Sequence, residues 1–151
     1  DPGVTSLLRA ELFDHLLKER IIKFAVVISG QGPEAYGMPE MFTPMQHVNA
    51  NRHLKKLAMI LTDGRYSGVS YGAAIGHITP EAADGGPIAA LKTGDTIVID
   101  IKKRKLDVEL SAAELKRRLK AVKQPKPRYT SGVMAKYARL VSSASEGAIT
   151  G

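Results

Sequence analysis

The 151-residue sequence contains no cysteine and no tryptophan, and aromatic residues make up only 5% of it. Without cysteine, the chain alone cannot form a disulfide, use a thiolate nucleophile, or hold zinc or an iron–sulfur cluster through thiolates. The scarcity of aromatic rings leaves few surfaces on which single-stranded nucleic acid could stack, so we expect no nucleic-acid partner. No apolar run approaches the roughly 20 residues that span a bilayer, and we expect no membrane partner either.

The sequence also lacks a basic and apolar leader before Asp1, which predicts a cytoplasmic location. The remaining composition, 44% hydrophobic and 25% charged residues, is typical of one globular domain. The formal charge is 22 − 15 = +7 at pH 7. This excess leaves open a basic module that binds a polyanion through residues 102–105 and 116–120, although such runs are usually solvated surfaces.

Hydrophobic spacing predicts a mixture of helices and strands, with residues 1–151 forming a single domain. The expected helices are 4–20, 40–52, one that starts at 79–81, 111–119 and 133–143, and the expected strands are 23–29, 57–61, 96–101 and 106–110. The last two strands form a hairpin with a basic tip. A proline-rich linker, 121–131, precedes the terminal helix. This mixture predicts an α/β fold with a compact, barrel-like sheet.

Two glycine-rich loops each follow an expected strand, where α/β proteins usually present ligand-binding groups. In the first, Glu40 offers a carboxylate suited to a hard cation such as magnesium, although the dipole of the following helix would also favour an acid there. In the second, Ser67 lies between Arg65 and the flexible Gly68. Its hydroxyl could meet a substrate while Arg65 holds an anion, but a loop serine is also a common turn former.

Five motifs carry a resemblance to a known family. They are GMPEM (37–41), TDGRYSG (62–68), IGH with TPEAADGGP (75–77 and 79–87), KTGD (92–95) and AKYARLVSSASEGA (135–148). In this order they resemble the C-terminal domain of the dihydroxy-acid dehydratase and phosphogluconate dehydratase family. The resemblance implies a swivelling β-barrel-like α/β domain with flanking helices, similar to the mobile domain of aconitases.

The resemblance further implies a hydro-lyase that dehydrates 2,3-dihydroxy carboxylic acids to 2-keto acids, of the type used in branched-chain amino-acid biosynthesis. Family members use an iron–sulfur cluster as a Lewis acid on the departing C3 hydroxyl, and a magnesium ion that holds the carboxylate end of the substrate. By resemblance, Glu40 matches the magnesium ligand and Ser67 matches the serine that takes the C2 proton as an alkoxide. The residues matching the substrate-binding scaffold around that serine are Asp63, Gly64, Arg65 and Gly68.

The cluster cysteines and the other magnesium ligands of the family belong to a larger N-terminal domain, so the resemblance implies a C-terminal fragment that is inactive alone and a homodimeric complete enzyme. The substrate stays open. The short spacing between Gly32 and Gly37 is closer to the phosphogluconate type, whereas residues 75–77, 85–87 and 140–148 are closer to the branched-chain type. A sugar-acid dehydratase of intermediate character is the third alternative.

Overall fold

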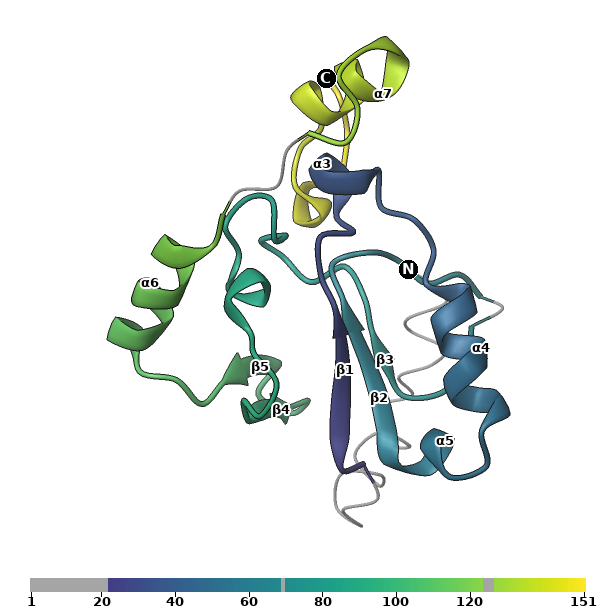
Figure 1. Cartoon of the computed structure of the whole chain (residues 1–151). Coiled ribbons are helices and arrows are strands. Elements are labelled where there is room, and N and C mark those ends of the chain that lie inside the picture. The colour runs from purple at the N-terminus through teal and green to yellow at the C-terminus, as the bar shows by residue number, and fades with distance from the viewer. Residues whose placement is uncertain (1–21, 69, 124–126) are drawn as a thin grey trace.

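The computed structural model describes residues 22–68, 70–123 and 127–151, and the helix expected over 4–20 lies outside them. The centre of the described chain is a three-stranded parallel sheet with the order β1-β2-β3 (Figure 1). Its strands are β1 (Phe24–Ile28), β2 (Ala58–Thr62) and β3 (Ala74–Ile75). The register aligns Val26 with Ile60 and Ile60 with Ala74. The expected strands at 23–29 and 57–61 are therefore confirmed.

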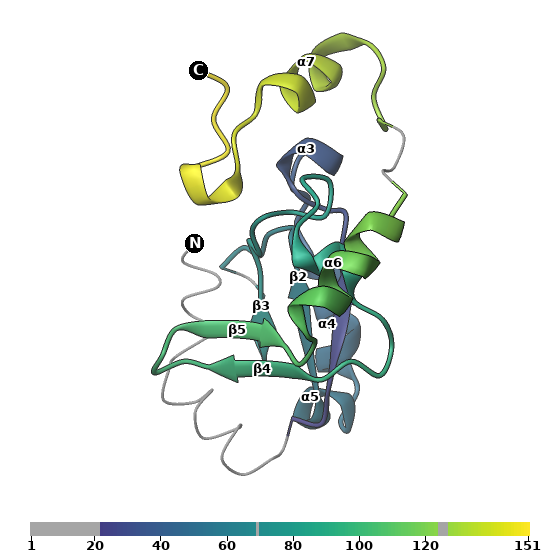
Figure 2. The same cartoon turned by 90° about the vertical axis from the view of Figure 1, so that its left-hand side faces the viewer.

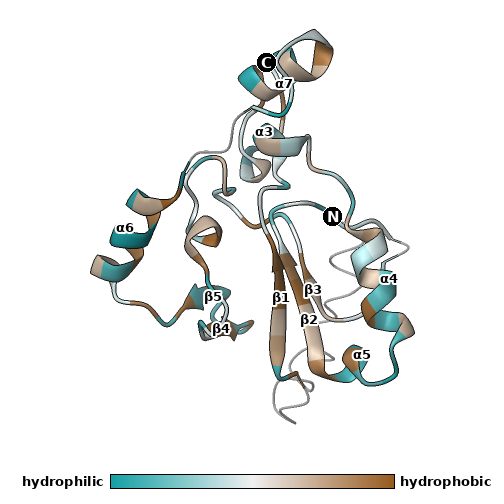
Figure 3. Cartoon of the chain, viewed as in Figure 1, coloured by the Kyte–Doolittle hydropathy of each residue, from teal (hydrophilic) through white to brown (hydrophobic). Residues whose placement is uncertain are grey.

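The central strand β2 is buried along its whole length, which explains its continuous apolar sequence. One face of the sheet packs against α4 (Phe42–Ala50), which confirms the helix expected over 40–52, and against the one-turn α5 (Leu54–Leu57). The other face packs against the apolar side chains of the hairpin expected over 96–110. Figure 3 shows this arrangement as apolar strands lying between the more polar outer elements.

The hairpin consists of β4 (Ile97–Asp100) and β5 (Lys105–Val108), paired antiparallel with Ile97 opposite Val108. It confirms the expected hairpin but forms a second, separate sheet. Figure 2 shows its strands crossing the direction of the parallel strands. Within the described residues no closed barrel is present, so the barrel-like part of the expectation is wrong there, because the hairpin packs on the face of the parallel sheet and does not pair with its edge.

Helix α6 (Ala112–Ala121) follows the hairpin and begins at the expected capping box, where the Ser111 hydroxyl accepts the Glu114 N–H at 3.2 Å. It packs against the 3₁₀ helix η1 (Pro87–Ala90). Arg118 joins α6 to the preceding turn through an ion pair with Asp95 at 2.6 Å, in which both side chains are nearly buried.

The glycine-rich segment after β1, expected to be a loop, contains the one-turn helix α3 (Pro33–Tyr36). Conversely, the helix expected to start at 79–81 is absent, and this part of the chain forms turns. The chain turns back so sharply here that a Cβ at Gly86 would overlap the Pro80 carbonyl. Glu81, the acid expected in a first helical turn, is instead buried against α3.

Helix α7 (Gly132–Leu140) and the 3₁₀ helix η2 (Ala144–Glu146) end the chain, with α7 against α3. The terminal helix stops earlier than the expected residue 143. The chain folds back there, and the Ser142 N–H donates to the Ile149 carbonyl at 2.8 Å. None of the helices in the described ranges is long and apolar enough to cross a membrane.

Candidate functional site

Two loops meet at the carboxyl end of the parallel sheet. The loop after β1 runs through α3 to Glu40, and the loop after β2 runs to Arg65. A short parallel bridge joins them: the Arg65 N–H donates to the Pro39 carbonyl at 3.2 Å, and the Met41 N–H donates to the Arg65 carbonyl at 2.8 Å. The two loops singled out in the sequence are therefore held in register by backbone hydrogen bonds.

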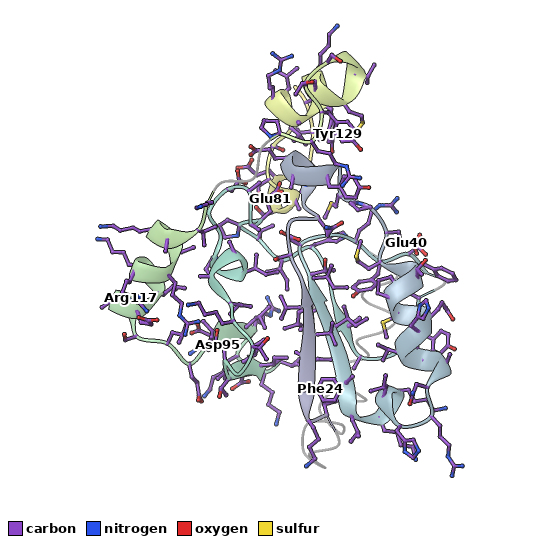
Figure 4. The ribbon with its side chains drawn as sticks, in the orientation of Figure 1. Phe24, Glu40, Glu81, Asp95, Arg117 and Tyr129 are labelled. Carbon is purple, nitrogen blue, oxygen red and sulfur yellow. The ribbon has the colours of Figure 1, made fainter. Side chains whose placement is uncertain are left out.

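The bridge brings the side chains of Glu40 and Ser67 together. Oε1 of Glu40 accepts both the Ser67 N–H, at 3.2 Å, and the Ser67 hydroxyl. The buried Ser70 hydroxyl reaches the same oxygen at 3.5 Å. Figure 4 shows Glu40 beside the start of α4. No side chain caps that helix, so the described hydrogen bonds of Glu40 connect it to the serine loop and not to the helix end.

Ser70 was not singled out in the sequence. The feature that could have indicated it is its position three residues after Ser67, a spacing that allows a turn. In that turn the Ser70 N–H donates to the Ser67 carbonyl at 3.1 Å. This turn directs both hydroxyls toward one carboxylate oxygen. The cluster of Glu40, Ser67 and Ser70 is called the carboxylate–serine cluster below.

Asp63 directly follows β2, on the loop that carries Ser67, and is fully buried. Its Oδ2 accepts the N–H groups of Gly30 at 3.0 Å and Ala82 at 2.9 Å, and its Oδ1 accepts the N–H of Gln31 at 2.8 Å. A carboxylate that accepts several backbone N–H groups satisfies the polar atoms of buried loops. Asp63 therefore joins three segments of chain at the carboxyl end of β2.

Glu81 has a similar role that the sequence did not reveal. Its buried carboxylate accepts the N–H of Glu34 at 2.7 Å and of Ala35 at 3.1 Å, and so caps α3. Figure 4 shows it beside that helix. Burial raises the pKa of Glu81, and partial burial, with the Asp84 carboxylate beside it, raises the pKa of Glu34 to about 7. The feature of the sequence that accompanies this role is the glycine at position 32, because a Cβ there would overlap the Glu81 carboxylate.

The other predicted site residues of the second loop are Arg65, Gly64 and Gly68, and they differ in exposure and in how closely other groups approach them. Arg65 is exposed, and its Nε donates to the Met38 carbonyl at 2.9 Å. Gly64 permits a close approach, because a Cβ there would lie 3.0 Å from the Pro39 carbonyl oxygen. Gly68 is exposed with open space around it. The intervening Tyr66 is fully buried, and its hydroxyl has no hydrogen-bond partner in the part of the chain that the structure describes.

The oxygen-only character of the carboxylate–serine cluster suits a hard cation such as magnesium. Three hydroxyl or amide donors point at Oε1 of Glu40, and none of the described hydrogen bonds reaches its Oε2. Residues 22–68, 70–123 and 127–151 contain no group of three or more His, Cys, Asp or Glu side chains placed to hold a metal. Glu40 could therefore serve as one ligand of such a cation only together with ligands from outside these ranges.

The cluster is partly buried, because Glu40 and Ser67 are half-buried and Ser70 is buried. Two cavities, of about 730 Å³ between β1 and the η1–β4 segment and about 310 Å³ between the hairpin and residues 75–79, are lined by neither Glu40 nor Ser67. Two exposed aromatic residues follow the cluster closely in sequence: Phe42 is 39% exposed and Tyr71 is 56% exposed. Exposed aromatic side chains next to a polar cluster are typical of a surface that contacts another molecule or domain.

The two basic runs do not form one surface. Figure 2 shows the hairpin tip at the end of the hairpin opposite to α6. At the tip Lys103 pairs with Asp100 at 3.6 Å, and on α6 Arg117 pairs with Glu114 at 2.7 Å. Separated and partly neutralised charges do not favour the alternative of a polyanion-binding module.

The fold and the cluster together define a class: an α/β domain that presents a carboxylate hydrogen-bonded to a serine hydroxyl on loops at the carboxyl end of a parallel sheet. Comparison with protein families makes this class specific. The model of the dihydroxy-acid/6-phosphogluconate dehydratase C-terminal family matches residues 8–148. The chain belongs to this family, as its motifs had indicated.

Curated relatives agree with that assignment. The chain is 52% identical over 126 residues to a dihydroxy-acid dehydratase of Methylococcus capsulatus, which covers 83% of this chain and 22% of the relative. It is 50% identical over 126 residues to one of Saccharolobus islandicus, with the same coverage, and 47% identical over 141 residues to one of Metallosphaera sedula. The last match covers 92% of this chain and 25% of the relative. The chain thus spans a quarter or less of the length of these relatives.

Proposed function

We propose that this chain is the C-terminal part of a dehydratase that removes water from a 2,3-dihydroxy carboxylic acid and yields a 2-keto acid. The observation that carries the proposal is the hydrogen bond between the Ser67 hydroxyl and Glu40. It unites the two residues matched to the base and to the magnesium ligand, which lie 27 positions apart in the sequence. The relatives' name, dihydroxy-acid dehydratase, supports the same class of substrate.

In the proposed reaction Ser67, as an alkoxide, takes the proton from C2 of the substrate. The electron pair of that C–H bond forms a C2–C3 double bond, the C3 hydroxyl leaves and is protonated to water, and the resulting enol tautomerises to the ketone. A serine hydroxyl is a poor base at its ordinary pKa, so its ionised form needs stabilisation. A magnesium ion on Glu40 would supply positive charge for that purpose when bound.

The chain's own residues prepare Ser67 for this step. The hydroxyl hydrogen of Ser67 is directed to Oε1 of Glu40, so the oxygen is oriented before substrate arrives. Asp63 and Gly64 hold the loop that carries it. The guanidinium of Arg65 is tied to the neighbouring loop by its Nε, and we assign its remaining N–H groups to an anionic group of the substrate.

The rest of the proposed enzyme supplies what this chain lacks. An N-terminal domain would provide the cysteines of the iron–sulfur cluster and the other magnesium ligands, in a homodimer in the cytoplasm. The exposed aromatic side chains of Phe42 and Tyr71, which follow the cluster closely in sequence, support a domain that closes over a site on that partner, as the mobile domain of aconitases does. We propose the branched-chain type of substrate first, with 6-phosphogluconate and other sugar acids as alternatives.

The test uses the complete protein that carries this domain, loaded with its metal groups. Turnover is measured on branched 2,3-dihydroxy acids, 6-phosphogluconate and unphosphorylated sugar acids. Ser67→Ala should lower kcat by at least about 100-fold with little change in KM, since loss of a proton acceptor in the transition state costs about 10²–10⁴-fold. The 151-residue chain by itself should show no turnover.

The matched control is Thr93→Ala, which removes the hydroxyl of an exposed residue outside the two loops of the cluster and outside residues 127–148. It should leave kcat and KM unchanged. Glu40→Gln should raise the magnesium concentration needed for half-maximal activity, because an amide binds the ion more weakly than a carboxylate. Retention of more than a tenth of the wild-type kcat by Ser67→Ala would overturn the proposed role of Ser67.

A further inference from the structure

The loop that delivers Glu40 has an unusual backbone. Gly37 and Met38 both have positive φ, 71° and 56°. A left-handed conformation costs a residue with a side chain about 1–2 kcal/mol, so Met38 keeps it only where neighbouring groups hold it. The Met38 N–H donates to the Gly32 carbonyl at 3.1 Å, across the helix α3. The position of Glu40 therefore depends on α3 keeping its shape.

Helix α3 cannot keep its shape alone, because a single helical turn is unstable without outside contacts. Glu81 holds its N-terminal end, as described above. Its other contacts come from residues 127–148, called the C-terminal clamp here. The Tyr36 ring of α3 stacks on the Tyr129 ring with centroids 6.4 Å apart and planes 17° apart, and the Arg128 guanidinium lies 3.8 Å from the Tyr36 centroid. Figure 4 shows Tyr129 next to α3.

The clamp also approaches the backbone of this loop directly, at Gly37. A Cβ on Gly37 would lie 2.8 Å from Cε of Met134, so the first turn of α7 rests on the backbone at the point where φ becomes positive. Ring stacking and a cation over a ring each contribute about 0.5–1.5 kcal/mol. This is the size of the backbone cost at Met38. None of the described hydrogen bonds joins the clamp to Glu40 or Ser67.

We propose that the C-terminal clamp positions the magnesium-ligating carboxylate Glu40 through α3, with Tyr129 as the positioning residue. The importance of that position rests on the proposed function, but the physical coupling does not. Without Tyr129, α3 loses the stacked ring that covers Tyr36, Met38 relaxes from its left-handed conformation, and Oε1 of Glu40 moves away from the Ser67 N–H.

The coupling is measured on the 151-residue chain by amide hydrogen exchange followed by NMR. Three amides report it. Met38 N–H reports the loop, Ser67 N–H reports the bond to Glu40, and Ile60 N–H, which donates to the Ala73 carbonyl at 3.0 Å, reports the core. Tyr129→Ala should speed exchange at Met38 and Ser67 by about tenfold relative to Ile60, the factor that corresponds to about 1.4 kcal/mol.

Two variants make the test specific. Tyr129→Phe keeps the stacked ring and should restore wild-type exchange at Ser67. Val133→Ala, on α7 with a side chain 80% exposed, should change none of the three amides. The proposal is overturned if Tyr129→Ala frees the α7 amides while Met38 and Ser67 stay as in the wild type. It is equally overturned if all three reporters accelerate by the same factor, which would mean general unfolding.

This outcome is separate from the test of the proposed function. If Ser67→Ala retains turnover while Tyr129→Ala exposes the Ser67 amide, the clamp exists and the assigned reaction is wrong. If Ser67→Ala loses turnover while Tyr129→Ala leaves the Ser67 amide protected, the reaction stands and the clamp is wrong.

Discussion

The substitution Asp63→Asn tests how the two loops are held at the carboxyl end of the sheet. The Asp63 carboxylate is fully buried and accepts three backbone N–H groups, two at Oδ2 and one at Oδ1. Asparagine has nearly the same shape but only one acceptor oxygen. If that oxygen takes the Oδ2 position, it keeps the Gly30 and Ala82 bonds and turns its NH₂ group toward the N–H of Gln31.

The size of the loss follows from those bonds. A hydrogen bond to a charged group contributes about 1.5–3 kcal/mol, and the Gln31 bond is lost outright. The two that remain become neutral and about half as strong. We expect Asp63→Asn to lower the free energy of unfolding by at least about 3 kcal/mol, the lower end of the sum of these losses. With a urea m-value of about 2 kcal/mol per molar, the midpoint of unfolding falls by at least about 1.5 M.

The assay is urea unfolding of the 151-residue chain, followed by far-UV circular dichroism. Asp107→Asn is the matched control, because Asp107 pairs with Lys105 at the exposed hairpin and such pairs contribute little. Its midpoint should stay within about 0.3 M of the wild type. A midpoint for Asp63→Asn within that same margin would refute the reasoning, since it would mean that neither the Gln31 bond nor the negative charge at the other two bonds contributes to stability.

Three further outcomes follow from the structure. Tyr66→Phe should raise the urea midpoint or leave it unchanged, because it removes a fully buried hydroxyl that has no hydrogen-bond partner among the described residues. A clear drop in the midpoint would show that this hydroxyl does have a hydrogen-bond partner. Glu34 has a folded pKa of about 7, above the ordinary 4.5, so its stabilising contribution is complete below pH 4.5 and is lost as the pH rises through 7. Glu34→Gln should therefore flatten the dependence of the free energy of unfolding on pH in this range. An unchanged pH dependence would contradict this prediction. Arg118→Ala leaves Asp95 without its ion pair and should lower the midpoint more than Arg117→Ala, whose side chain is 69% exposed; equal effects would count against the assigned pairing.

Local patterns predicted the elements whose form is decided within a few residues. The apolar runs gave β1 and β2, the alternating residues gave the hairpin, and the Ser111–Glu114 pair gave the start of α6. In each case the side chains that determine the element lie within it or next to it. These predictions hold because propensity, patterning and capping agree with the final packing.

The predictions that failed concern contacts between distant segments. The barrel was wrong within the described residues because nothing in a strand's sequence says whether it pairs with an edge or packs on a face. The helix expected at 79–81 was wrong because Glu81 bonds to the N–H groups of Glu34 and Ala35, 47 and 46 residues away. A local cap pattern cannot compete with a tertiary use of the same acid.

The candidate site was predicted in its parts but not in its assembly. Glu40 and Ser67 were singled out from their motifs, and their mutual hydrogen bond required the parallel bridge between Glu40 and Arg65. Ser70 and Glu81 were missed because one is an ordinary loop serine and the other an ordinary surface-type acid until burial gives each its role.

The geometry of the two loops suggests how this domain could contribute to catalysis at a site located on the proposed N-terminal domain. The buried Tyr66 ring holds the loop with Ser67 to the core. The hydrogen bonds from Arg65 to Met38 and Pro39 join the loop with Glu40 to the loop with Ser67. Ser67 and Glu40, the proposed base and the proposed ligand, are therefore held together within this one domain. In the proposed closure of this domain over its partner, both groups would arrive together and at a fixed separation, so the closure would set only the distance of the pair from the substrate and not the geometry within the pair.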